Sequence, residues 1–145
     1  MLLGAFAHSR SPAYLEAQEY LLHTLAREHP AGYRGLPQPA RTHAATIGLF
    51  FDDLDKLVAH GMIDPRLVIG SHGPGIVRLR DALAPYVHQE RNANGLPFWV
   101  HFEDLAAPTA ATPPTAIHTA LRLRQRPPPA SPRRTNGSTD GASGR

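Results

Sequence analysis

Residues 47–65 read IGLFFDDLDKLVAHGMIDP, and this stretch decides the fold. Its large apolar side chains recur every three or four positions, which is the period of one face of an α-helix: Ile47, Phe50, Phe51, Leu54, Leu57 and Val58. Gly61 then favours a left-handed helix end, and Met62 is placed to fold back onto the helix as its apolar partner. Asp64 and Pro65 suit the cap and the first position of a following helix. The stretch therefore predicts a helix that begins near Pro39, ends near Gly61 and is followed by another.

The same period continues on both sides of this stretch. Apolar residues at helical spacing, bounded by proline, glycine and capping residues, predict helices over residues 12–28, 39–61, 65–69, 76–91 and 97–105. Gly70–Gly75 is expected to form a flexible turn, and Pro85 to kink the helix that contains it near Asp81 to Ala84. No stretch alternates at period two. The sequence predicts an all-α fold, a compact bundle of about five helices.

Composition divides the chain at residue 107. The chain is 41% apolar, but after Ala107 the only large apolar side chains are Ile117, Leu121 and Leu123. A core is therefore expected only before that point, where these residues should converge: Phe50, Leu54, Leu79, Leu83, Trp99 and Phe102. The sequence predicts a helical domain over residues 1–107 and a disordered, basic, proline-rich tail over residues 108–145.

Charge divides at the same place. Residues 1–107 hold nine Lys and Arg against eleven Asp and Glu, a net charge of −2, whereas residues 108–145 hold six Arg and one Asp, a net charge of +5. The isoelectric point near 9.8 therefore reflects mostly the tail. Arginines interleaved with prolines predict weak, salt-sensitive contact with nucleic acid phosphates: Arg122, Arg124, Arg126, Arg133 and Arg134. The tail has no aromatic side chain on which bases could stack.

Several classes of protein fit the sequence poorly. The chain has no cysteine, which excludes disulfides, thiol catalysis and cysteine–metal sites. The apolar start, residues 1–7, is too short for a signal-peptide core, and no run approaches the ~20 apolar residues of a membrane span. None of the nine histidines forms an i,i+4 pair with another, and no phosphate loop or nucleophile elbow occurs. We therefore expect a cytoplasmic protein with no cofactor, no metal and no membrane partner.

Three residues are weak candidates for a binding site. Asp52 and Asp53, close to Asp55, could hold a divalent cation or act as an acid–base pair. The ordinary alternative is a solvated helix face with an Asp52–Lys56 ion pair at i,i+4. Arg78, just after the glycine-rich turn, could bind an anion at the amino end of its helix, or it could form an intramolecular ion pair.

A resemblance rests on several short blocks in fixed order. They are Phe50-Phe51-Asp52-Asp53-Leu54, Leu57-Val58, Gly61-Met62-Ile63-Asp64, Leu67-Val68, Ile76-Val77-Arg78, Leu83-Ala84-Pro85-Tyr86-Val87 and Phe102-Glu103-Asp104-Leu105. Over about residues 11–107 the chain resembles a group of small bacterial helical proteins catalogued only as a domain of unknown function. The resemblance implies a helical fold and carries no activity, substrate or cofactor.

Three functional hypotheses remain open. The first is a non-enzymatic helical module for protein interaction or regulation, whose partner is another protein or a second copy of itself. The second is a nucleic-acid-associated protein that uses the arginine-rich tail. The third is an enzyme whose site is assembled from scattered residues around Asp52, Asp53 and Arg78. An apolar patch on one helix face would favour the first, and a pocket of converging polar groups the third.

Overall fold

The all-helical prediction is confirmed. The computed structural model describes residues 2–29, 33–120, 122 and 124, and in these ranges it contains seven α-helices, one 3₁₀ turn and no strand. None of the described helices is long and apolar enough to cross a membrane. The elements are α1 (Leu2–His8), α2 (Pro12–His23), α3 (Leu25–Glu28), η1 (Tyr33–Gly35), α4 (Ala40–Ala59), α5 (Pro65–Asn94), α6 (Val100–Ala111) and α7 (Pro114–Ala120).

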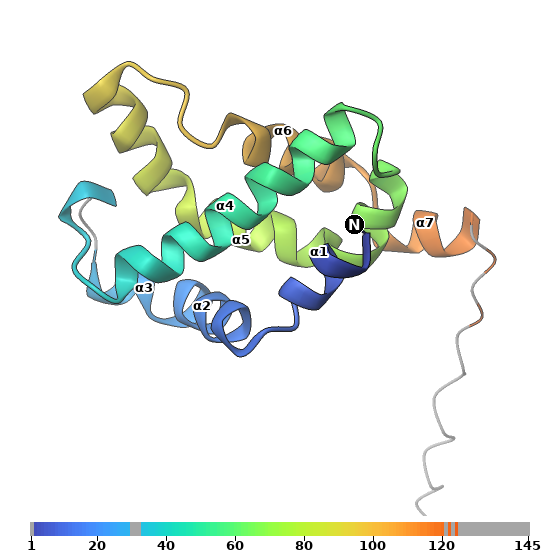
Figure 1. Cartoon of the computed structure of the whole chain (residues 1–145), viewed down its shortest axis with the longest axis horizontal. Coiled ribbons are helices and arrows are strands. Elements are labelled where there is room, and N and C mark those ends of the chain that lie inside the picture. The colour runs from blue at the N-terminus through green and yellow to red at the C-terminus, as the bar shows by residue number, and fades with distance from the viewer. Residues whose placement is uncertain (1, 30–32, 121, 123, 125–145) are drawn as a thin grey trace, which may run out of the picture.

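Helix α4 lies at the centre of the bundle. It crosses the molecule diagonally in Figure 1 and packs against α2, α5 and α6. The ring of Phe51 is fully buried and stacks on Phe102 of α6, with the ring centroids 5.0 Å apart. The helix pairs α5–α6 and α2–α5 complete the packing around α4.

The predicted start of α2 and the predicted end of α4 are confirmed, except for the position of Met62. The Ser11 hydroxyl accepts a hydrogen bond from the backbone N–H of Tyr14 at 3.2 Å, as an N-cap should. Gly61 takes the left-handed conformation (φ +69°). Met62, however, is 58% exposed, and Ile63 is buried in its place. The backbone N–H groups of Met62 and Ile63 both donate to the carbonyl of Leu57. In this turn Ile63, and not Met62, packs against the end of the helix.

The core prediction is right for five residues and wrong for Phe50, which is only partly buried. Successive residues of a helix point 100° apart, so two adjacent phenylalanines do not point in the same direction. The buried stripe of α4 follows Ile47, Phe51 and Leu54 at i, i+4 and i+7, which selects the second phenylalanine. The first lies at the edge of this stripe.

The predicted turn at Gly70–Gly75 is wrong, because α5 is one continuous helix of 30 residues. Pro74 has no backbone N–H and therefore removes one hydrogen bond from the helix, but packing against neighbouring helices outweighs the loss of this bond. Gly73 is buried, with space at its Cβ position bounded by Ile69 and Thr109. The His72 ring stacks on Phe6 of α1 at 5.8 Å. The prediction gave too much weight to glycine and proline. Buried residues recur at helical spacing through this segment without interruption.

Helix α5 also contains Pro85, and its ribbon bends in the yellow-green part of Figure 1. A proline within a helix removes one hydrogen bond and crowds the preceding turn, which accounts for such a bend. The helix ends at Gly95 in the left-handed conformation (φ +64°).

The helical structure extends beyond both ends of the predicted bundle. The apolar start forms α1, the predicted helix over 12–28 is divided at Thr24, and the predicted boundary at residue 107 lies inside α6. Helix α7 packs on α5 through Ile117, which is buried and lies 3.0 Å from where a Cβ at Gly70 would stand. The predicted disorder of residues 108–145 is therefore wrong for residues 108–120, most of which belong to α6 and α7. Residues 121, 123 and 125–145 of the predicted tail lie outside the described residues.

Helices α4 and α6 meet at Gly48. A Cβ atom at this position would stand 2.4 Å from the Trp99 ring, closer than any tolerated contact. Trp99 precedes α6 in the left-handed conformation (φ 47°, ψ 46°), which costs a non-glycine residue about 1–2 kcal/mol. Its ring is buried across α4 and stacks on Phe98 with centroids 4.3 Å apart. Only glycine at position 48 permits this approach.

We expect Gly48→Ala to destabilise the fold. Over-packing costs about 1–3 kcal/mol, against about 1 kcal/mol that alanine gains over glycine inside a helix. Gly75→Ala is the matched control, because nothing lies within 4 Å of its Cβ position, and it should raise the free energy of unfolding by about 0.5–1 kcal/mol. Urea unfolding of both variants measures the difference. Equal effects would show that Trp99 does not lie against Gly48.

Candidate functional site

The amino end of α6 is capped by a residue of α4. Trp99 occupies the N-cap position and its side chain makes no capping hydrogen bond. The Oδ1 atom of Asp52 instead accepts the backbone N–H of Phe102 at 3.3 Å. An acidic group at the positive end of a helix dipole is favourable. Asp52, a predicted site residue, thus has a structural partner 50 residues away.

Asp55 makes a second link between the same helices. It is 3% exposed, and its Oδ2 atom lies 3.0 Å from Nδ1 of His101. Burial raises the pKa of Asp55, and the hydrogen bond from His101 partly opposes that rise. Among the residues described, His101 makes no hydrogen bond to a serine or threonine hydroxyl.

Asp53, the third aspartate of this group on α4, points away from the core, and its side chain is 71% exposed. Lys56 lies 3.0 Å from Asp52 and 2.9 Å from Asp53, so the predicted Asp52–Lys56 ion pair is present. Hydrogen bonds to both carboxylates raise the pKa of Lys56. In the described part of the chain, no three His, Asp or Glu side chains form a group that could hold a metal ion.

Arg78 lies well inside α5, which begins at Pro65. The idea that Arg78 binds an anion at a helix amino terminus is therefore wrong, because the turn that would have started a new helix is itself helical. Arg78 is exposed and belongs neither to the Asp52 contacts nor to the groove described below. The three sequence candidates do not form one site.

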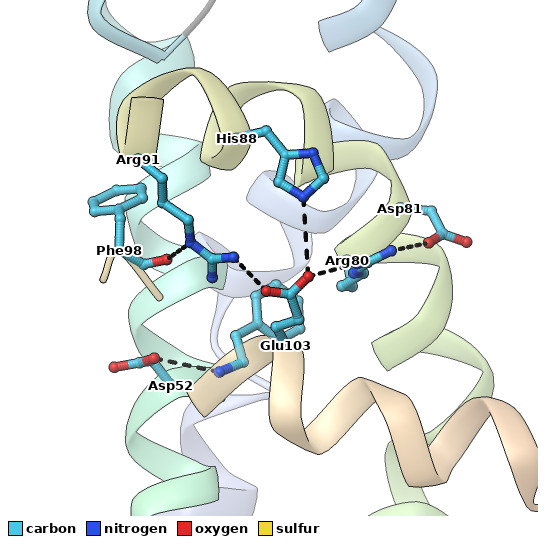
Figure 2. Close-up of polar contacts among 8 residues, drawn as sticks. Asp52, Arg80, Asp81, His88, Arg91, Phe98 and Glu103 are labelled. Carbon is cyan, nitrogen blue, oxygen red and sulfur yellow. Dashed lines mark hydrogen bonds and ion pairs between the residues drawn. The ribbon is translucent and has the colours of Figure 1, made fainter. Parts of the chain in front are cut away.

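Glu103 is the centre of a polar cluster that the sequence did not reveal. Its carboxylate accepts hydrogen bonds from Arg80, at 2.7 Å, and from Arg91, and His88 lies 4.0 Å from it. Figure 2 shows the carboxylate on α6 between the two guanidinium groups of α5. Arg91 also donates to the carbonyl of Phe98 at 2.9 Å, which fixes the loop before α6. The cluster fastens α6 and this loop to α5.

The two arginines hold the pKa of Glu103 below its ordinary value, Arg91 having the larger effect and Arg80 the next, although burial opposes them. A carboxylate held ionised in this way is a poor general acid or base near neutral pH. The cluster is better suited to joining helices than to proton transfer.

An apolar groove runs along the outer face of α4. It has a volume of about 610 Å³, and His8 of α1 contributes to its lining. The lining residues are His8, Thr42, Ala45, Thr46, Leu49, Phe50, Asp53, Leu54 and Leu57. Leu49 is 52% exposed, and the His8 ring stacks on Phe50 with centroids 5.6 Å apart. Among the predicted site residues, only Asp53 contributes to this groove.

The sequence contained a signal for this groove. Thr42, Ala45 and Leu49 lie on the side of α4 away from the buried stripe, whereas Leu57 lies beside the stripe and packs partly against the core. A helix with apolar residues on two sides has two surfaces to cover. The sequence interpretation followed the larger stripe and treated the other side as a solvated acidic face.

We expect two adjacent aspartates to differ in their effect on stability. Asp52→Ala removes the cap of α6 and should lower the free energy of unfolding by about 1–2 kcal/mol. Asp53→Ala removes an exposed carboxylate and should change the free energy by less than about 0.5 kcal/mol. Thermal and urea unfolding give both values. If Asp52→Ala left the free energy of unfolding unchanged, Asp52 would not act as a structural cap and would again be a candidate functional residue.

We expect Glu103→Gln to reduce stability only where Glu103 is ionised. Because the folded-state pKa is lowered, its stabilisation is present above the unfolded pKa near 4.5 and is lost as the pH falls through the lower folded value. The side chain is 37% exposed, so solvent screening limits the loss at pH 7 to about 1 kcal/mol. Urea titrations at pH 7 and pH 3 should show the two proteins converging at low pH. Asp81→Asn, which alters an exposed partner of Arg80, is the control and should change little.

The comparison with known proteins gives one match. No curated protein and no solved structure matches the chain. The family model described as "Domain of unknown function (DUF4760)" matches residues 3–108, a range that includes most of α1 and most of α6. This range contains the groove, the Asp52 cap and the Glu103 cluster. The chain belongs to the DUF4760 family.

Proposed function

We propose that the chain is a non-enzymatic helical module that binds another protein in the cytoplasm through the outer face of α4. The observation that carries this proposal is the apolar groove of about 610 Å³ along that face, with Leu49 half exposed at its centre. Contiguous apolar surface is costly in water and marks interaction sites more often than it remains bare.

The shape and chemistry of the groove fit a helical partner. It follows a 20-residue helix and is lined by side chains spaced three and four positions apart. A second amphipathic helix presents apolar anchors at the same spacing, which is the common helix-in-groove mode of recognition. The polar atoms at its margin, on His8, Thr42 and Asp53, would set the orientation of such a helix.

The contacts of the polar residues favour this proposal over an enzyme. Asp52 and Asp55 are engaged in holding α6, and Glu103 is held by two arginines. Arg78 lies apart from both groups. A catalytic site needs polar groups that converge on a space where substrate could sit, and the groove on α4 is lined mainly by carbon.

The nucleic-acid alternative rests on the tail. Of its arginines, Arg122 and Arg124 belong to the described residues, and the groove on α4 carries no basic stripe. No contact of the described residues favours nucleic acid over protein, so this alternative stays a prediction from charge.

A photo-crosslinking amino acid at Leu49 tests the proposal. In the cells that produce the protein, the Leu49 variant should give covalent adducts with protein after irradiation. The same amino acid at Leu96 is the control, because Leu96 is 66% exposed and lies outside the groove. Adducts are identified by mass spectrometry, and circular dichroism checks that both variants are folded.

The proposal requires adducts at position 49 and far fewer at position 96. Folded variants that give no adduct at either position, or equal adducts at both, would overturn it. Nuclease treatment before gel analysis separates adducts with nucleic acid from adducts with protein.

A further inference from the structure

We infer that α1 is a pH-sensitive strap, which packs across α4 and α5 while the His72 ring is neutral and is released when that ring takes up a proton. Helix α1 lies beside the amino-terminal part of α5 (Figure 1). It has seven residues, too few for a helix that is stable in isolation. Its contacts with each of the other elements are small. The position of α1 therefore depends on a few side chains.

Two ring contacts hold α1 near its carboxyl end. The Phe6 ring stacks on His72 of α5, with the centroids 5.8 Å apart and the planes 18° from parallel. The His8 ring stacks on Phe50 of α4, with the centroids 5.6 Å apart. One contact joins α1 to α5 and the other joins it to α4, so a change at either ring acts on the whole attachment.

Phenylalanine rings surround His72. Besides the stack on Phe6, the His72 ring meets Phe50 edge-on at 6.0 Å and Phe51 edge-on at 6.2 Å. Partial burial lowers the pKa of His72, and no charged group among the described residues offsets this effect. A proton on this ring is a charge placed among apolar groups, which is costly. The charged ring is better solvated when α1 moves away.

The nearest titratable groups on α1 and α2 do not provide the same switch. Burial raises the pKa of Tyr14, which meets Phe50 edge-on, to about 12, so this phenol stays neutral below that pH. The other histidine of the cluster, His8, is exposed to water, where both forms of its ring are solvated.

The charged groups of α4 and α5 are engaged elsewhere. Lys56 pairs with Asp52 at 3.0 Å and with Asp53 at 2.9 Å. Along α5, Arg66 and Arg78 each stand six positions from His72, which places them on other sides of the helix. None of these groups shifts the pKa of His72.

The packing of α1 should weaken as the pH falls. The ordinary pKa of histidine is near 6.5, and the packed state holds that of His72 below this value. Packing is therefore strongest above about pH 6.5. Below it, the equilibrium constant for packing falls by up to about tenfold per pH unit, until the lower pKa of the packed state is reached.

Release of α1 changes the groove on α4, and this step rests on the proposed function. His8 contributes to the lining of the groove, and its ring covers one face of Phe50. When α1 leaves, that face becomes available to a partner helix. Acid pH should therefore strengthen binding at the outer face of α4.

The distance between two spin labels tests the strap. The chain has no cysteine, and open space surrounds the Cβ positions of Gly4 on α1 and Gly75 on α5. Labels on Gly4→Cys and Gly75→Cys in one full-length chain therefore report on both helices without crowding. Pulsed electron paramagnetic resonance should give a narrow distance distribution at about pH 8 and a broad one at about pH 5. Circular dichroism checks that the bundle stays helical at both.

Two ring substitutions assign the effect to one histidine. His72→Phe keeps a ring that can stack on Phe6 but cannot take up a proton, so its distribution should stay narrow at both pH values. His8→Phe is the matched control and should respond to pH as the wild-type chain does.

An NMR titration of His72 provides the reciprocal measurement. Phe6→Ala weakens the packing of α1, so by linkage it should raise the pKa of His72 toward its ordinary value. This measurement decides the matter even where His72→Phe itself disturbs the packing, because an unchanged pKa would show that α1 does not control the His72 ring.

Several results would overturn the inference. They are a distribution that is equally narrow or equally broad at both pH values, one that narrows in acid, a His72→Phe chain that responds as the wild type does, and a His8→Phe chain that does not respond. Loss of the helical signal together with the packing of α1 would also overturn it, because acid would then act on the whole bundle. The proposed function survives each of these results, since photo-crosslinking at Leu49 tests it separately.

Discussion

The attachment of the amino end of α6 to α4 is the constraint on which the rest of the bundle depends. Trp99 can cross α4 only because Gly48 has no side chain, and this crossing places the start of α6 beside Asp52. The carboxylate then supplies the cap that the helix's own N-cap residue cannot provide. Once α6 is fixed there, Phe102 stacks on Phe51 and Glu103 faces the arginines of α5.

This attachment also divides α4 into two faces with different roles. The inner face holds the core stripe and the two aspartates that contact α6. The outer face keeps Asp53 and the apolar residues of the groove. Asp52 thus has a structural role, whereas the groove on the outer face is lined mainly by apolar residues. This division supports the proposed binding role.

The sequence predicted the structure correctly wherever local features, such as helix caps and the spacing of apolar residues, decide it. Ser11 and Pro12 begin α2, Gly61 ends α4, and the all-helical class follows from the period of apolar residues. It failed where contacts between distant residues decide. Glycine and proline at 70–75 indicated a turn, but packing against α1 and α6 keeps that segment helical. The role of Asp52 depends on a residue 50 positions away, and no local pattern indicates such a partner.

Phe50 and Leu49 show why the groove was missed. Both are apolar residues of a helix that has a strong core stripe, and Phe50 was assigned to that stripe. The structure places Phe50 at its edge and Leu49 outside it, so α4 has apolar side chains on two opposite sides. Packing within the chain covers one side through α2, α5 and α6. On the second side, His8 of the short α1 stacks on Phe50, and Leu49 stays half exposed. The hydrophobic effect that drives core formation acts on this side as well, which is why the proposed function assigns it to a partner.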